Sequence, residues 1–251
     1  MYHSRIRYNA DMSERTAPPA LDRFVTEVTG IFRDRLRAIV TYGGSIHLTA
    51  PDAPGDDGVH TLVLVDSIDA PDLRACAGLA DSWARRGLAV PLLLTSAELK
   101  RSLDAFPMEF AHILADHTPV IGEDPLAGFS VAPEDVRRAC EGQARSHALH
   151  LRESYLECGA EPRDLARLIS ASAPPFRALL AAVARLHGEG GPAAAETLAR
   201  VAAASGLDAA TVRQVLGATG TRMNAADAES LFPLYLEAAE RLVRHVDAWR
   251  A

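Results

Sequence analysis

The segments that favour β-strands are confined to the first half of the chain. Residues 38–42, 59–65 and 89–94 are short runs rich in β-branched and apolar side chains, which is typical of strands. From residue 133 onward, apolar residues recur every three or four positions, as in amphipathic helices, and strand-like runs stop. This order predicts an α/β domain with a mixed sheet and flanking helices, followed by an all-α domain.

The same change of pattern sets the domain boundaries. We expect a polar tail at 1–16, an α/β domain at 17–130 and an α-helical domain at 131–251. The tail lacks apolar periodicity, so it is expected to pack on nothing. Met12, within it, is an alternative start of the chain.

Individual elements follow from spacing and from proline and glycine boundaries. Helices are predicted at 19–36, 71–86 and 97–105, and then at 133–158, 162–172, 174–187, 192–204, 208–217 and 224–249. Residues 108–114 predict a fourth strand, with a short extension at 119–121. The run at 59–65 is apolar on both faces, as expected of a central strand covered on both sides.

Charge and composition exclude several classes of protein. The chain has 26 Lys and Arg residues against 33 Asp and Glu residues, for a net charge of −7, and it has no basic run. This balance disfavours duplex nucleic acid as a partner. No apolar run reaches the roughly 18 residues that a membrane span needs. The beginning of the sequence has no apolar signal-peptide core, which predicts a cytoplasmic protein.

The cysteines predict neither a disulfide framework nor a zinc site. They are three in number, and their spacing matches no zinc motif: Cys76, Cys140 and Cys158. Each lies in a helix-like pattern, where cysteine usually behaves as a small buried hydrophobic residue.

One constellation points to chemistry. The strand at 38–42 runs into the glycine-rich turn Gly43-Gly44-Ser45, and an acidic loop ending in Asp56-Asp57 precedes the strand at 59–65. This order resembles the nucleotidyltransferase fold, the group that contains DNA polymerase β and kanamycin nucleotidyltransferase. The likeness covers about residues 20–158. Shorter segments at 91–95, 106–110 and 122–126 look like a bacterial subfamily of nucleotidyltransferase-domain proteins.

The resemblance implies roles for particular residues. The backbone N–H groups of Gly43, Gly44 and Ser45 would bind the triphosphate of a nucleotide. Asp57 and Glu109 would be the catalytic acids and would hold magnesium, which prefers carboxylate oxygens. Two divalent ions about 3.5–4 Å apart would then stabilise the transferred phosphoryl group.

The sequence departs from the family at the metal site. The family carries Asp-x-Asp on the strand after the turn, because residues two apart point to the same face. Here the matching position reads Gly58-Val59-His60 or Val59-His60-Thr61. Asp56 and Asp57 are adjacent, so on an extended strand they would face opposite ways. The departure predicts a degenerate metal site.

The favoured interpretation is therefore a weak or inactive nucleotidyltransferase-like protein that binds a nucleotide, a partner protein or a second copy of itself. The first alternative is an active magnesium-dependent enzyme that moves a nucleoside monophosphate from a nucleoside triphosphate to a small hydroxyl acceptor. The second is a ribonuclease that resembles HEPN helical domains, using Arg145 and His150. The third is a scaffold without a small-molecule ligand.

Overall fold

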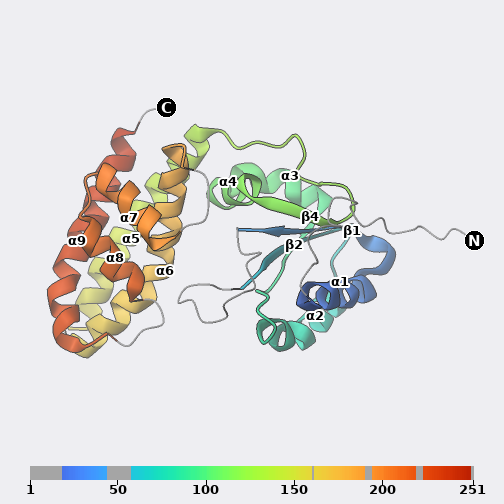
Figure 1. The fold of residues 1–251 in the computed structure, drawn as a ribbon, viewed down its shortest axis with the longest axis horizontal. Coiled ribbons are helices and arrows are strands. Elements are labelled where there is room, and N and C mark those ends of the chain that lie inside the picture. The colour runs from blue at the N-terminus through green and yellow to red at the C-terminus, as the bar shows by residue number, and fades with distance from the viewer. Residues whose placement is uncertain (1–18, 44–57, 160, 190–193, 219–222, 250–251) are drawn as a thin grey trace, which may run out of the picture. The chain divides into compact units, whose positions relative to one another are not determined.

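The chain divides into two compact units, Met1–Ser130 and Val131–Ala251. The computed structural model describes residues 19–43, 58–159, 161–189, 194–218 and 223–249, so the predicted tail lies outside the described residues. In this part of the chain all strands belong to the first unit, and the second unit is helical (Figure 1). Within these ranges, no helix combines the length and the apolar character that crossing a membrane requires.

The first unit is built on a four-stranded mixed sheet with the order β3-β2-β1-β4. The strands are β1 (Leu36–Tyr42), β2 (His60–Val65), β3 (Leu92–Thr95) and β4 (His117–Ile121). Strand β1 is antiparallel to both β2 and β4, whereas β2 and β3 run parallel. Strand β2 is thus an interior strand, as predicted, and Leu62 and Val63 on its two faces are fully buried.

Helices cover both faces of this sheet (Figure 1). Helices α1 (Pro19–Phe32) and α2 (Ala70–Ala84) form a hydrophobic core with Ile39, Val63 and Val65. Helices α3 (Ser96–Ala105) and α4 (Pro107–Ala115) lie on the opposite side. Because successive strand residues alternate between faces, the residues next to Ile39 and Val63 point toward α3 and α4.

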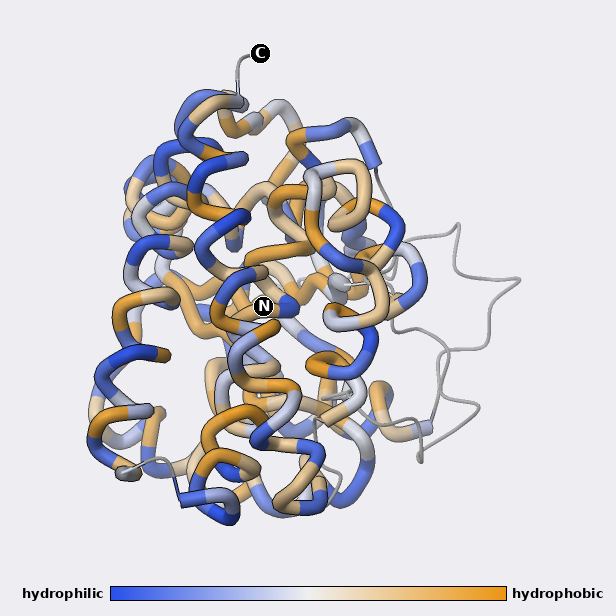
Figure 2. Tube along the Cα trace, turned by 90° about the vertical axis from the view of Figure 1, so that its left-hand side faces the viewer, coloured by the Kyte–Doolittle hydropathy of each residue, from blue (hydrophilic) through white to orange (hydrophobic). Residues whose placement is uncertain are grey.

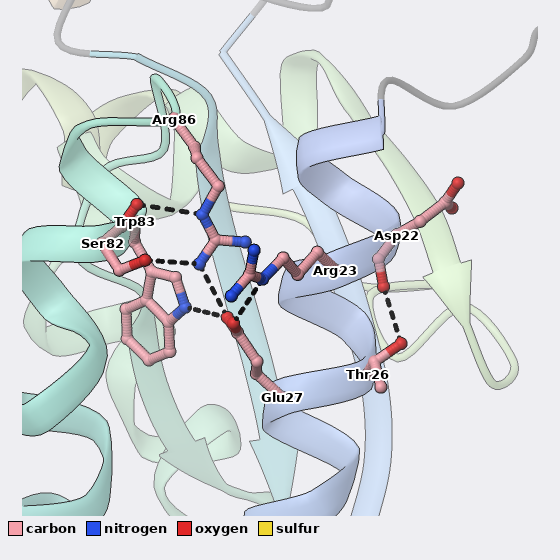
Figure 3. Close-up of polar contacts among 7 residues, drawn as sticks. All are labelled: Asp22, Arg23, Thr26, Glu27, Ser82, Trp83 and Arg86. Carbon is pink, nitrogen blue, oxygen red and sulfur yellow. Dashed lines mark hydrogen bonds and ion pairs between the residues drawn. The ribbon is translucent and has the colours of Figure 1, made fainter.

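The carboxylate of Glu27 links helix α1 to helix α2 (Figure 3). Glu27 on α1 accepts hydrogen bonds from Trp83 Nε1 and Arg86 Nη2 on the α2 side, both at 2.8 Å, and from Arg23 Nε at 3.0 Å. Burial opposes ionisation of Glu27, but the hydrogen bonds from Arg86, Trp83 and Arg23 outweigh it and lower its pKa. The cluster joins two helices and has a structural role.

The predicted strand at 108–114 is wrong, because these residues lie in helix α4. Pro107 occupies the first turn, where its missing N–H costs no hydrogen bond within the helix. Phe110 and Ile113, three residues apart, are the buried side chains, as expected of a helix. An apolar run this short cannot be assigned by periodicity alone.

Two boundaries in the first unit also differ from the prediction. Helix α1 ends at Phe32 rather than at residue 36, and the 3₁₀ turn Arg33–Arg35 leads into β1. Arg33 has a φ of 52°, which ends the helical run. Strand β3 begins at Leu92, later than the predicted 89, because Pro91 has no N–H to donate to a neighbouring strand.

The second unit contains helices α5 (Pro133–Glu157), α6 (Pro162–Leu186), α7 (Ala195–Ala204), α8 (Ala209–Gly217) and α9 (Ala225–Ala248). Helices α5, α6 and α9 contact one another, and α7 and α8 pack on α6. Hydrophobic and hydrophilic segments alternate along these helices (Figure 2), as amphipathic packing requires. All three cysteines are described; none forms a disulfide, and only Cys158 is not fully buried.

The prediction of two helices at 162–172 and 174–187 is also wrong, because one continuous helix, α6, covers both ranges. Pro174 and Pro175 lie inside it and are both exposed. Each proline removes one backbone hydrogen bond, but on the solvent side water can satisfy the carbonyl that is left without a donor. Burial of Ala173 and Phe176 on the opposite side holds the helix together through this point.

Candidate functional site

The glycine-rich turn begins where strand β1 ends. Gly43 has a φ of +87°, a conformation that favours glycine, and its N–H donates to the carbonyl of Asp116 at 3.0 Å. A Cβ atom at this position would lie 3.1 Å from His112 Nε2 and 3.7 Å from His60 Cδ2. Even one methyl group at Gly43 would therefore crowd the His112 ring, so both the backbone conformation and the packing favour glycine here. Gly44 and Ser45 lie outside the described residues.

Aromatic rings from three strands and one helix meet at this end of the sheet. Tyr42 is the cross-strand partner of His60 on β2 and of His117 on β4, so the three side chains share one face. The rings of Tyr42 and His60 stack at a centroid distance of 5.5 Å. His112 of α4 approaches the Tyr42 ring edge-on at 6.1 Å. We call Tyr42, His60, His112 and His117 the sheet-end cluster.

The environment of the sheet-end cluster differs from residue to residue. Burial raises the pKa of the Tyr42 hydroxyl, so this side chain stays neutral at physiological pH. His117 Nε2 lies 3.3 Å from Asp124 Oδ2, and the other oxygen of Asp124 accepts from Leu126 N–H at 2.9 Å. His60 has no hydrogen-bond partner among the described residues and is only half-buried.

Carboxylates are missing from the strands where the resemblance implies them. Strand β2 has the sequence HTLVLV, and its parallel neighbour β3 has the sequence LLLT. Glu109, expected in a strand, instead lies in the first turn of α4 and is exposed. Asp57 lies outside the described residues. The segment in which the resemblance implies Asp-x-Asp, residues 58–61, contains Gly58, Val59, His60 and Thr61.

The side chains of the sheet-end cluster do not fit magnesium. Magnesium takes oxygen ligands, mainly carboxylates and water, whereas the cluster offers imidazole nitrogens and one phenol. Among the described residues, no group of three or more His, Cys, Asp or Glu side chains is arranged to hold a metal ion. No catalytic step through magnesium follows from these side chains.

The structure does not assemble the ribonuclease pair that the sequence suggested. Arg145 and His150 both lie on α5, five residues apart, which places them about 140° apart around the helix. Arg145 forms ion pairs with Glu141 and Asp247, at 3.0 and 3.1 Å. His150 Nδ1 lies 2.8 Å from the Ser146 carbonyl oxygen, one turn earlier. Each side chain therefore serves its own local contact.

The buried histidine of this segment is His147, which the sequence analysis did not single out. Its Nε2 lies 2.8 Å from Tyr235 Oη, and Tyr235 O–H donates to the Ser172 carbonyl at 3.2 Å. Since the tyrosine has one hydroxyl hydrogen, His147 donates from Nε2 to the tyrosine oxygen. Burial, assisted by nearby His150, lowers the pKa of His147 to about 4.

The second unit also has a shallow groove between α5 and α9, with a volume of about 330 Å³. Its charged lining residues are Arg145, Arg152, Arg244 and Glu240. Arg145 pairs with Asp247, and Arg152 pairs with Glu240 at 2.6 Å. These ion pairs offset the charges of Arg145 and Arg152.

Sequence reasoning did not predict the sheet-end cluster. It named Gly43, which lies beside the cluster, as a phosphate-binding residue, and it named His60 only within the segment that departs from the family pattern. His112 was missed because the segment that carries it was assigned to a strand. His117 pairs with Tyr42 across β1 and β4, a register that depends on chain segments about 75 residues apart. The one local sequence signal for this cluster was Tyr42, which directly precedes Gly43 and Gly44.

Comparison with known proteins bears on the fold. No protein-family model matches the chain, and no curated protein matches it significantly. Its structure is similar to the crystal structure of spectinomycin adenyltransferase AAD(9) from Enterococcus faecialis with ATP and spectinomycin. The TM-score is 0.56 and the sequence identity 10%, over 89% of this chain and 98% of that chain. At this identity the likeness shows a nucleotidyltransferase-like fold with a helical carboxyl-terminal region.

Proposed function

We propose that this protein is a nucleotidyltransferase-like protein that binds a nucleotide at the end of strand β1 and has weak or no magnesium-dependent transferase activity. One observation carries the proposal. The two adjacent parallel strands β2 and β3 contain no carboxylate, and His60 lies in the segment where the resemblance implies Asp-x-Asp.

The loss of carboxylates affects catalysis more than binding. Two-metal transfer needs several converging carboxylates to neutralise and space the ions. Backbone N–H groups of a glycine-rich turn bind phosphate without those acids. The positive φ of Gly43 is compatible with such a turn. A protein of this kind can therefore still bind a nucleotide after it has lost transferase activity.

The test has two parts, binding and turnover, on the full chain. Binding of ATP, GTP, CTP and UTP is measured by calorimetry with and without magnesium. Turnover is measured with labelled nucleotides, magnesium or manganese, and a panel of hydroxyl acceptors that includes the protein itself. We expect at least one nucleotide to bind, with transfer undetectable or very slow.

Variants decide between this proposal and the active enzyme. Asp57→Asn and Glu109→Gln remove the two remaining candidate ligands, and Asp81→Asn on the exposed face of α2 is the matched control. Metal-dependent transfer that both variants abolish and the control keeps would replace our proposal by the active transferase. RNA cleavage without added metal, lost in Arg145→Ala, would support the ribonuclease instead. Absence of any nucleotide binding would support a scaffold or a protein-binding role.

A further inference from the structure

The groove between α5 and α9 lies within the second unit, and an ion pair crosses it at each end. Arg145 pairs with Asp247 at 3.1 Å, and Arg152 pairs with Glu240 at 2.6 Å. The two pairs are seven residues apart on each helix, which corresponds to about 10.5 Å along a helix axis. The groove volume of about 330 Å³ lies at the lower end of the range for small-molecule sites, about 300–1,000 Å³.

The section between the two ion pairs has an apolar lining. Ala148 and Leu149 on α5 and Val243 on α9 lie there, one turn inward from the paired residues. Ala148 is buried and Val243 half-buried, whereas Leu149 is 54% exposed. A ligand that covers Leu149 and Val243 would remove apolar surface from water, which favours binding.

Arg244 lies in the same section and differs from the other lining arginines. Among the described residues it forms no hydrogen bond or ion pair, whereas Arg145 and Arg152 are paired across the groove. A guanidinium group carries a positive charge and five N–H donors. The groove therefore combines an apolar lining with one cation that no described carboxylate neutralises.

We propose that this groove binds a small amphipathic anion, a carboxylate joined to an apolar ring system. The carboxylate would accept charge-assisted hydrogen bonds from Arg244, and the rings would cover Leu149 and Val243. A ligand cation would be repelled by Arg244, and a neutral apolar ligand would leave the guanidinium without a partner. The ion pairs at both ends limit the apolar section, which favours a small molecule over an extended peptide.

This inference goes beyond the proposed function, because the site lies in the second unit and needs neither a nucleotide nor a metal ion. Its test uses three probes that share one ring system: naphthoate, neutral naphthamide and cationic naphthylmethylamine. Each probe is titrated into the ¹⁵N-labelled full chain, and amide chemical shifts report both the affinity and the place of binding.

For the unaltered protein we expect naphthoate to bind about tenfold more tightly than naphthamide, because only the anion can accept a charge-assisted hydrogen bond. Naphthylmethylamine should bind most weakly. Added salt should weaken the binding of naphthoate and leave that of naphthamide nearly unchanged. The shifted amides should lie in residues 145–152 of α5 and 240–247 of α9.

Variants separate the charge from the apolar surface. Arg244→Gln should reduce the affinity for naphthoate to that for naphthamide, and Arg163→Gln, at an exposed arginine of α6 that also has no partner among the described residues, is the matched control. Leu149→Gln should weaken the binding of both probes. Leu156→Gln is its control, because Leu156 is 77% exposed on the same helix and does not line the groove.

Reversal of the charge provides the sharpest arm. In Arg244→Glu, naphthylmethylamine should bind more tightly than naphthoate, because the groove then offers an unpaired carboxylate. Circular dichroism melts confirm that each variant folds, and the exposed position of Arg244 favours this.

The outcomes either support or overturn the site. Naphthoate binding that Arg244→Gln weakens and Arg163→Gln leaves unchanged supports it, as does the reversed preference of Arg244→Glu. No binding of naphthoate, equal affinity for naphthoate and naphthamide, or shifted amides outside α5 and α9 would overturn it. None of these results bears on nucleotide binding, which is measured separately.

Discussion

Histidines in the two units of this protein are placed in opposite ways. In the first unit, His60 and His112 stand half-buried at the end of a sheet, beside Gly43. In the second, His147 is buried between helices, with its Nε2 engaged by Tyr235. The comparison teaches that the residue type alone does not indicate function. What differs is burial, because His147 is enclosed by the helical unit whereas the other two rings remain partly exposed.

The same contrast holds for charged groups. In the second unit, the exposed arginines of α5 are engaged in ion pairs, as Arg145 and Arg152 show. In the first unit, the paired carboxylate Glu27 joins α1 to α2, away from the sheet-end cluster. These paired groups thus join helices within each unit.

The largest expected effect concerns the strand that supports the cluster. Leu64 on β2 is 6% exposed and lies between β1 and β3. Leu64→Ala should destabilise the first unit by about 2–5 kcal/mol, through lost apolar contact and a cavity. Urea denaturation and hydrogen exchange of the β1 and β2 amides measure the loss. Leu73→Ala on α2, where the side chain is 51% exposed, is the control and should cost far less. Equal losses in the two variants would contradict the interior position of β2.

The next prediction tests the buried histidine of the second unit. The pKa of His147 is lowered to about 4, so the unfolded chain binds a proton below pH 6.5 that the folded chain does not. Its contribution to stability is complete above pH 6.5 and is lost progressively as the pH falls toward 4. The loss should reach about 3 kcal/mol.

His147→Gln provides the matched variant, because glutamine can donate to Tyr235 without titrating. Urea denaturation at pH 7 and pH 4 should show a smaller fall in stability for this variant than for the unaltered protein. An identical fall in both would mean that His147 does not control the acid sensitivity of the helical unit.

A smaller effect is expected at the turn itself. Gly43→Ala places a Cβ atom at a φ of +87° and 3.1 Å from His112 Nε2. The strained backbone should cost about 1–2 kcal/mol. Nucleotide affinity should fall as well, because the side chain fills the proposed phosphate site.

Gly78→Ala is the matched control for that substitution. Gly78 lies in α2 and an added Cβ would meet nothing within 4 Å. Alanine there should stabilise the helix by up to about 1 kcal/mol and leave nucleotide binding unchanged. A Gly43→Ala protein with full stability and full affinity would remove the turn from the proposed site.

Much of the fold could be predicted from the sequence, because the local sequence patterns and the tertiary packing agree. The apolar run around Leu64 predicted an interior strand, and the change of period near residue 133 predicted a helical second half. The errors arose where one sequence pattern was compatible with two different secondary structures. The run after Pro107 is too short to separate a helix from a strand, and Pro174 interrupts a helix only when water cannot replace the lost hydrogen bond.

Less of the candidate site could be predicted from the sequence. His60 was visible as a departure from a known pattern, whereas the place of His112 depends on how α4 packs over the sheet. The neighbours of Tyr42 on β1 also depend on strand register, which no local window contains. The degenerate metal site thus stays a prediction from the sequence, and the structure was needed to show which side chains lie near Gly43.

The most direct test of the central claim observes the two imidazoles themselves. In a ¹³C-labelled protein, the Cε1–Hε1 resonances of the histidine rings are assigned with single His→Gln variants and followed during titration with ATP in EDTA. We predict that the resonances of His60 and His112, which lie beside Gly43, shift on addition of ATP, while those of His147 and His150 stay in place. Shifts confined to other histidines, or no shift at any histidine, would contradict the account.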